Sequence, residues 1–353
     1  MAQMERIRFA VAGTGWRALF YIRAAKNLPE LFELTGVLCR TPERAESFAL
    51  EYGVRTFLNL DELLETKPEF VVNCIYKADL ADMSIRLMER GMPVLCETPL
   101  AIRLDKLARL RDVQQKTGVT LEMAEQYFLY PSHAARRAVI SSGLLGDVTY
   151  CYLSMMHDYH GISMLRAYLG EESGPVRIRA HKTRTPVVVT GGRGGYITSG
   201  EVGDEYRVLA QFDYGDGRVG MYDFAGTQYH SAIRSNHLRI LGTRGEIADD
   251  EVRWIDENSR PHLDRLMMHT DGITGTICAI SFAGERVYEN PFRTNAAMTE
   301  DDIAVSTVIV RMGESVRGGA VHYPHAFRDS YLSCVMTAAA DEGADVSADA
   351  PAW

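Results

Sequence analysis

The stretch Val11-Ala12-Gly13-Thr14-Gly15-Trp16-Arg17-Ala18 ends the apolar run 7–12 and opens an amphipathic segment. In a strand–turn–helix unit, Gly13 permits the tight turn, Gly15 lets the backbone approach a pyrophosphate, and Ala18 keeps helix and strand close. The first N–H groups of such a helix bind phosphate oxygens. The G-x-G-x-x-A spacing therefore predicts a dinucleotide site, with a plain strand-to-helix turn as the alternative. The predicted site also includes the intervening Thr14, Trp16 and Arg17.

Around this turn, short apolar runs alternate with amphipathic stretches. We expect strands at 7–12, 34–39, 57–60, 70–75 and 93–96, and helices at 16–27, 61–65 and 82–90. A further helix starts at Thr41-Pro42-Glu43, where Thr41 supplies the capping oxygen and Pro42 takes the first helical position. Alternating strands and helices predict a parallel, doubly wound α/β sheet of the Rossmann type with right-handed crossovers.

The pattern changes near residue 147. Strand-like runs at 147–156, 206–212, 218–225 and 237–241 are separated by glycine turns, which predicts a largely antiparallel sheet. We expect helices at 132–142 and 325–340, and another after residue 160. The segment 190–203 holds six glycines and is expected to be a loop. The chain is therefore divided into a Rossmann domain, 1–123, and an α/β substrate-binding and oligomerisation domain, 124–353, whose last helix packs back on the first domain.

Composition limits the class of protein. The 353 residues are 46% hydrophobic and 24% charged, which is typical of a globular protein of about two domains. The net charge is -9 and no Lys/Arg cluster offsets it, which argues against nucleic-acid or anionic-membrane partners. Six scattered cysteines without a C-x-x-C pair predict a reducing compartment, no disulfide framework and no metal site. With no leader-like start and no apolar run long enough to span a membrane, we expect a cytoplasmic protein.

The end of the second expected strand bears on the cofactor. NAD sites usually place an acidic residue there to bind the ribose hydroxyls. Here the strand ends in Cys39 and Arg40, with Arg44 one helical turn further on. This favours a 2′-phosphate and hence NADP(H), with NAD(H) as the alternative. Arg40 could instead stack on adenine or remain solvated.

A second motif, Val94-Leu95-Cys96-Glu97-Thr98-Pro99-Leu100-Ala101, follows the fifth expected strand. Together with the glycine turn it resembles the glucose–fructose oxidoreductase / inositol dehydrogenase / MocA (Gfo/Idh/MocA) family, in which this strand ends in Glu-Lys-Pro. Further similarities lie at 90–93, 140–147 and 241–245. The resemblance implies a Rossmann domain followed by a domain with an open sheet, and association into homodimers or homotetramers through that sheet. It also implies hydride transfer to or from one carbon of a sugar, cyclitol or related compound.

The resemblance implies particular site residues, and some differ from the family pattern. Thr98 stands where the family has its catalytic lysine, and a threonine hydroxyl can only hydrogen-bond the reacting oxygen. The residues that the resemblance places beside the cofactor are Ile75, Tyr76, Glu97, Thr98, Pro99 and Gln126. His160, followed by Gly170, fits the family's second motif, but Met156 and Ser163 occupy its two Asp positions.

The run His157-Asp158-Tyr159-His160-Gly161 concentrates polar groups that would each need a partner if buried. We assign His160 as general acid/base, because imidazole titrates near neutrality, with Tyr159 or His157 as helper. A polar strand end facing solvent is the alternative. Metal binding is disfavoured because consecutive side chains on a strand point to opposite faces. The expected substrate contacts are Asp158, Tyr229 and His230.

These features predict an NAD(P)-dependent oxidoreductase acting on a small carbohydrate-like molecule. The absent lysine leaves two alternatives open. One is transient redox chemistry, in which a tightly bound NAD(H) assists cleavage or elimination of a glycoside without net oxidation. The other is a catalytically inactive NAD(P)-binding sensor or scaffold.

Overall fold

The computed structural model describes residues 5–170 and 174–348. They form two compact units. The first contains residues 5–131, 270–278 and 290–330, and the second contains 132–170, 174–269, 279–289 and 331–348. The division therefore differs from the expected boundary after residue 123, because two later segments of the chain belong to the first unit. The sequence analysis expects no leader at the start of the chain. Residues 1–4 of that segment lie outside the described residues.

The first unit contains a six-stranded parallel sheet. Its strands are β1 (Ile7–Ala12), β2 (Phe32–Leu38), β3 (Thr56–Phe57), β4 (Phe70–Asn73), β5 (Val94–Cys96) and β6 (Leu121–Met123). The order β3-β2-β1-β4-β5-β6 confirms the expected Rossmann sheet and reverses direction between β1 and β4. Ligands of open α/β sheets bind beyond the carboxyl ends of the strands at such a reversal.

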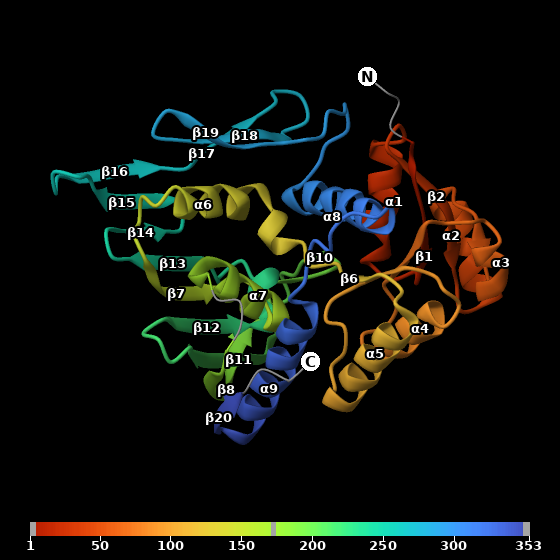
Figure 1. Ribbon diagram of the computed structural model, residues 1–353, viewed down its shortest axis with the longest axis horizontal. Coiled ribbons are helices and arrows are strands. Elements are labelled where there is room, and N and C mark those ends of the chain that lie inside the picture. Colours follow the sequence, from red (N-terminus) through yellow and green to blue (C-terminus); the bar gives the residue numbers. More distant parts are fainter. Residues whose placement is uncertain (1–4, 171–173, 349–353) are drawn as a thin grey trace. The chain divides into compact units, whose positions relative to one another are not determined.

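Three helices of the first unit begin with a side-chain cap, which Thr41, Asn59 and Thr299 supply. The helices of this unit are α1 (Ala18–Asn27), α2 (Pro42–Tyr52), α3 (Leu60–Leu64), α4 (Leu80–Met88), α5 (Leu104–Thr117) and α8 (Glu300–Val316), with a short 3-10 turn, η1 (Tyr127–Leu129). Thr41 caps α2 as expected, because its hydroxyl accepts from the Arg44 N–H. Helix α8 was not expected. It begins with a capping box between Thr299 and Asp302 and lies beside α1 (Figure 1), far from it in sequence.

The second unit is built on a nine-stranded sheet in the order β16-β15-β14-β13-β7-β12-β11-β8-β20. Its strands are β7 (Val148–Ser154), β8 (Val176–Val188), β11 (Val202–Asp213), β12 (Val219–Ala225), β13 (His237–Gly242), β14 (Gly245–Ala248), β15 (Glu251–Ile255), β16 (Pro261–Arg265) and β20 (Asp345–Ala348). The β7–β12 pair is parallel and the other seven pairs are antiparallel, which confirms the expected, largely antiparallel sheet.

Smaller elements complete the description. The glycine-rich segment contains a short hairpin of β9 (Gly191–Gly192) and β10 (Gly195–Tyr196). A three-stranded sheet consists of β17 (Met267–Thr270), β18 (Ile277–Phe282) and β19 (Glu285–Glu289). Helices α6 (Pro131–Ser141) and α9 (Ala326–Glu342) occupy the two segments where helices were expected.

Helix α7 (Asp158–Leu169) corrects the expectation that residues 157–160 end a strand. It packs on β7 and β12 (Figure 1), and its side chains are buried almost all round. Such a helix has no polar face, so its sequence lacks the apolar stripe that announces an amphipathic helix. Gly161 allows the close approach, since a Cβ there would lie 2.5 Å from the ring of Tyr222 on β12.

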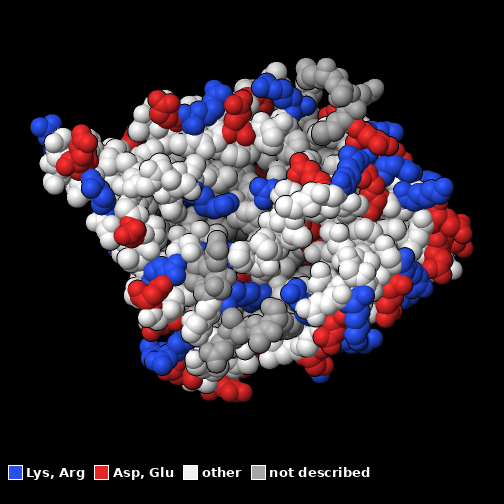
Figure 2. All heavy atoms as spheres, viewed as in Figure 1, with Lys and Arg blue, Asp and Glu red and all other residues white. Residues whose placement is uncertain are grey.

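The surface carries charges of both signs. On the face shown in Figure 2, Lys and Arg side chains are interspersed with Asp and Glu. Ion pairs such as Arg239–Glu246 join side chains of opposite charge on the protein. Across residues 5–170 and 174–348, none of the helices combines the length and apolarity that crossing a bilayer would require.

We predict that Gly161→Ala lowers the stability of the second unit. The added methyl group would overlap the buried Tyr222 ring, and overpacking of this kind costs about 1–3 kcal/mol. Gly226→Ala is the control, because a Cβ there meets nothing within 4 Å. Thermal unfolding followed by calorimetry should show a lower midpoint for Gly161→Ala alone. Equal midpoints for the two variants would contradict the close packing of α7.

Candidate functional site

The glycine turn lies at the reversal of the first unit's sheet. Gly13 follows β1, has φ +120°, and lies so close to the end of β4 that a Cβ would come within 2.7 Å of the Cys74 carbonyl oxygen. Only glycine fits this backbone and this spacing. At Gly15, by contrast, a Cβ would meet nothing within 4 Å, so the turn is open there. This open backbone at the start of α1 fits the phosphates of a dinucleotide.

The end of β2 presents arginine rather than a carboxylate. Arg40 is exposed. Arg44 lies against the glycine turn, where its Nη2 donates to the Thr14 carbonyl at 2.9 Å. Cys39 is only 4% exposed, and its thiol contacts the Val37 carbonyl. Burial raises the pKa of this thiol although Arg44 opposes the shift, so Cys39 stays a neutral group.

Other predicted cofactor residues differ in their surroundings. The Ile75 backbone nitrogen lies against Gly13, at 3.1 Å from a Cβ placed there, whereas Tyr76 is 69% exposed. Trp16 is 48% exposed beside the turn and packs edge-on against Phe20. The structure therefore brings Ile75 to the glycine turn. The role of each residue in cofactor binding stays a prediction.

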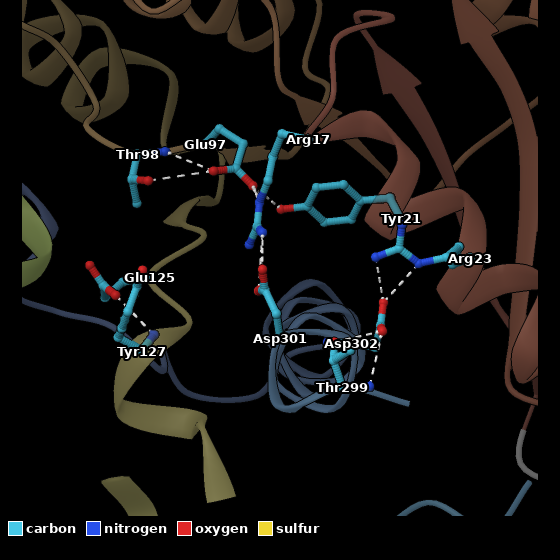
Figure 3. Close-up of polar contacts among 10 residues, drawn as sticks. All are labelled: Arg17, Tyr21, Arg23, Glu97, Thr98, Glu125, Tyr127, Thr299, Asp301 and Asp302. Carbon is cyan, nitrogen blue, oxygen red and sulfur yellow. Dashed lines mark hydrogen bonds and ion pairs between the residues drawn. The ribbon is translucent and has the colours of Figure 1, made fainter. Parts of the chain in front are cut away.

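Glu97, which directly follows β5, is bound by three neighbours (Figure 3). Its Oε1 accepts from Arg17 Nε at 2.9 Å and from the Tyr21 hydroxyl at 2.5 Å. Its Oε2 accepts from the backbone N–H of Thr98 at 3.2 Å and from the Thr98 hydroxyl at 3.4 Å. Both carboxylate oxygens are thus engaged within the protein, so Glu97 holds the start of the Glu97-Thr98-Pro99 segment in place.

Arg17 joins this carboxylate to helix α8. Its Nη1 donates to both carboxylate oxygens of Asp301, at 3.0 and 2.9 Å. In the amide orientation that satisfies its neighbours, Gln126 accepts from Arg17 Nη2 at 3.0 Å. The Arg17, Glu97 and Asp301 side chains are 15%, 10% and 18% exposed. We call Arg17, Tyr21, Glu97 and Asp301 the Arg17 cluster. Two predicted cofactor residues, Arg17 and Gln126, are therefore hydrogen-bonded to other protein groups.

Burial and charge shift the pKa values within the Arg17 cluster. Burial by itself lowers the pKa of Arg17, but the charges of Glu97 and Asp301 outweigh it and raise that pKa. Burial, followed by the charge of Glu97, raises the pKa of Tyr21. Burial also raises the pKa of Asp301, against the opposing charge of Arg17. The cluster therefore keeps its cation and its phenol protonated and holds a proton on Asp301 more readily than an exposed site would.

Sequence reasoning missed Tyr21 and Asp301. Tyr21 lies one helical turn after Arg17 on α1, a spacing that places two side chains on one face. Asp301 belongs to the acidic start of α8, where Thr299 and Asp302 give a capping signal that could have revealed the helix. Nothing in that signal indicates that Asp301 would pair with a residue so distant in sequence.

In the second unit, the predicted residues His157, Tyr159, His160 and Tyr229 lie together. The Tyr229 hydroxyl is 2.7 Å from His157 Nδ1, and the Tyr159 hydroxyl is 3.4 Å from His157 Nε2. The His160 ring centroid lies 5.1 Å from that of His157 and 4.2 Å from that of Tyr159. We call these four residues the imidazole cluster. Its groups can pass protons between imidazole and phenol.

The remaining predicted substrate residues flank the imidazole cluster. Asp158 has φ +40°, an uncommon backbone for a non-glycine residue, and its N–H donates to the Tyr222 hydroxyl at 2.8 Å. Burial, followed by the charge of Asp158, raises the pKa of Tyr222. His230 is exposed, with its ring centroid 6.4 Å from that of Tyr229.

The helical start changes one argument of the sequence analysis. Residues 157 and 160 do not alternate between the faces of a strand, because they lie at the N-cap and within the first turn of α7. Their rings are neighbours for this reason. Even so, the described residues hold no group of three or more His, Cys, Asp or Glu that could hold a metal ion.

Comparison with known proteins identifies the first unit. Residues 7–125 match the sequence profile of the Gfo/Idh/MocA group, described as an oxidoreductase family with an NAD-binding Rossmann fold. The match covers all six strands of the Rossmann sheet. The activities recorded for individual relatives are those of other proteins, to which this chain has low sequence identity.

Two curated Gfo/Idh/MocA relatives illustrate the range of similarity. An uncharacterized oxidoreductase of Rhizobium meliloti is 29% identical over 147 residues, 41% of this chain and only 44% of that protein. The scyllo-inositol 2-dehydrogenase (NADP(+)) of Bacillus subtilis is 27% identical over 265 residues, 70% of this chain and 76% of that protein. The first of these alignments spans less than half of its relative.

Solved structures share this fold along nearly the whole chain. A levoglucosan dehydrogenase, solved with NADH and levoglucosan, is similar over 98% of this chain and 100% of its own, with a TM-score of 0.69. The identity is 17%, so the likeness concerns the fold alone.

We predict that Arg17→Met destabilises the first unit, increasingly as pH rises. The variant leaves Glu97 and Asp301 buried without their counter-charge, and breaking such a pair costs about 3–5 kcal/mol. Without Arg17, the pKa of the buried Asp301 carboxyl rises further in the folded variant, which then holds a proton that the unfolded chain has already released. The stability lost relative to wild type should therefore grow from about pH 5 to about pH 8. Chemical denaturation at several pH values measures it.

Arg23→Met is the matched control for Arg17→Met. Arg23 bridges Asp302 on the same pair of helices; its side chain is 42% exposed, and the buried Asp302 carboxylate keeps the Thr299 N–H and hydroxyl as donors without it. An ion pair of this kind contributes about 1 kcal/mol or less. A pH-independent loss for Arg17→Met, or equal losses for the two variants, would contradict the role given to the buried cation.

Proposed function

We propose that this protein is a cytoplasmic NAD(P)-dependent oxidoreductase that acts on a hydroxyl or carbonyl carbon of a sugar, cyclitol or related small molecule. The observation that carries the proposal is the glycine turn at the reversal of the parallel sheet, where Gly13 is sterically required and Gly15 is open. The family of the first unit and the inositol dehydrogenase relative support the chemistry.

A bound nicotinamide dinucleotide would accept or donate the hydride. The chain's own residues bind and orient it. The turn from Gly13 to Ala18 and the start of α1 hold the pyrophosphate, Arg40 and Arg44 bind the adenosine end, and Glu97, Thr98 and Pro99 line the nicotinamide side. In the second unit, His160 exchanges the proton that accompanies hydride transfer, assisted by Tyr159 or His157, while Asp158, Tyr229 and His230 contact substrate.

The basic end of β2 favours NADP(H) over NAD(H). Exposed Arg40 offers a charge-assisted hydrogen bond to a 2′-phosphate, and Arg44 holds its guanidinium beside the Thr14 carbonyl. A carboxylate at this position would instead repel that phosphate. The B. subtilis relative described as an NADP(+) enzyme is consistent with this preference.

We predict that Arg40→Leu weakens NADPH binding by about ten- to a hundred-fold and leaves NADH binding unchanged, because only the 2′-phosphate loses its partner. Fluorescence titration of the purified chain gives both dissociation constants. Arg103→Leu removes an exposed arginine that pairs with Asp105 and should change neither constant. Tighter binding of NADH than of NADPH by the wild type would overturn the preference.

We also propose self-association through the exposed face of the nine-stranded sheet into a homodimer or homotetramer. Leu209 on β11 is 40% exposed, and it borders a surface groove with Met221 and Gln211. Apolar side chains, Met among them, are typical of the cores of interfaces between subunits.

We predict that His160→Asn lowers kcat by about 10²–10⁴-fold and leaves the nucleotide dissociation constant unchanged, because general acid–base catalysis contributes on that scale. The assay follows nicotinamide absorbance with a panel of sugars and cyclitols. Product formation that needs the cofactor but gives no net absorbance change would indicate transient redox chemistry. Cofactor binding without any turnover would indicate a sensor or scaffold and would contradict the proposed activity.

A further inference from the structure

The phenol of Tyr229 contacts two nitrogens of one residue, His157. Its oxygen lies 3.0 Å from the backbone nitrogen of His157 and 2.7 Å from the ring nitrogen Nδ1. A backbone N–H can only donate, so the phenol oxygen accepts that hydrogen bond. The phenol's own proton then has Nδ1 as an acceptor at short range. The contact with Nδ1 is compatible with either direction, because a phenol oxygen can accept two hydrogen bonds. With the phenol as donor, Nδ1 carries no proton and the neutral ring carries it on Nε2.

The other ring nitrogen of His157 faces the second phenol of the imidazole cluster. Nε2 lies 3.4 Å from the Tyr159 hydroxyl, so its proton is directed at that oxygen. Tyr159 is 7% exposed, and its ring packs against His160, which is 3% exposed. With Tyr229 as donor to Nδ1, the hydrogen bonds run in one direction, from Tyr229 through His157 to Tyr159. In that arrangement Tyr159 accepts from His157 and keeps its own proton to donate.

Anchored neighbours hold Tyr229 in position. It ends the 3-10 turn η2 (Gly226–Tyr229), in which Thr227 donates to the buried carboxylate of Glu205 at 2.6 Å. Gln228 donates to the Ser154 carbonyl, also at 2.6 Å, and so ties the turn to the end of β7. The Tyr229 ring packs on Phe224, with centroids 4.9 Å apart. A phenol fixed on both sides in this way can impose its hydrogen-bond direction on a neighbour.

We propose that Tyr229 is a positioning residue that fixes His157 as the Nε2–H tautomer and thereby makes Tyr159 a proton donor. This changes the predicted part of Tyr229 from substrate contact to control of the imidazole. The part that this His157 tautomer plays in proton exchange with a substrate rests on the proposed function. The tautomer itself is a property of the second unit that can be measured without substrate or cofactor.

Tyr222 provides a matched control. Like Tyr229, it accepts a backbone N–H at the start of α7, in this case that of Asp158 at 2.8 Å. The two phenols therefore satisfy neighbouring donors of the same helix end, which has no side-chain cap at His157. Only Tyr229 also bonds the imidazole. Replacing either tyrosine by phenylalanine removes one cap, but only Tyr229→Phe removes the hydrogen bond to Nδ1.

The test uses the full chain with ¹⁵N-labelled histidine and long-range ¹H–¹⁵N correlation spectra, which distinguish the two neutral tautomers. The His157 signals are those missing from His157→Gln. The wild type should show a single Nε2–H pattern, and Tyr222→Phe should keep it. Tyr229→Phe should lose it and give averaged signals of both tautomers.

An Nδ1–H or averaged pattern in the wild type would overturn the proposal, as would an unchanged Nε2–H pattern in Tyr229→Phe. The wild-type spectrum decides the tautomer even if a phenylalanine variant fails to fold. These spectra do not depend on hydride transfer. A protein that shows the predicted tautomer but turns over no sugar would therefore contradict the proposed function and leave this inference standing.

Discussion

The buried guanidinium of Arg17 is the constraint on which the first unit's site depends. Removing a cation from water is costly unless charged partners surround it, and here Glu97 and Asp301 supply them. Because these partners come from the end of β5 and the start of α8, one side chain fixes three elements relative to each other. The Glu97-Thr98-Pro99 segment and the glycine turn therefore share one anchor, in helix α1.

In the second unit, buried polar groups at the start of α7 are paired with neutral partners rather than with charges. The start of α7 presents backbone N–H donors, and His157 offers no side-chain cap. Two phenols, Tyr222 and Tyr229, accept those N–H groups and also fill the space around the helix start. Buried polar groups that are fully paired hold a single geometry, because every alternative leaves a donor unsatisfied. The imidazole cluster is ordered by the same contacts that begin its helix.

How much the sequence predicts depends on how local each signal is. The glycine turn, the Thr41 cap and the alternation of strands and helices are local patterns, and they predicted the Rossmann sheet correctly. The sequence analysis did not predict that α7 begins at Asp158, because this helix is buried almost all round and its sequence shows no apolar stripe. The pairing of Arg17 with Asp301 joins positions 284 residues apart, and no local pattern specifies such a contact. The candidate site was therefore predicted as residues but not as a network.

The role of Thr98 is related to the charges of the Arg17 cluster. One cation, Arg17, faces two carboxylates, Glu97 and Asp301, and Thr98 adds no charge to the Arg17 cluster. Thr98 instead donates neutral hydrogen bonds to Glu97. Burial raises the pKa of Asp301, so that carboxyl binds a proton more readily than an exposed one would. Position 98 thus contributes to the surroundings of Glu97 through hydrogen bonds alone.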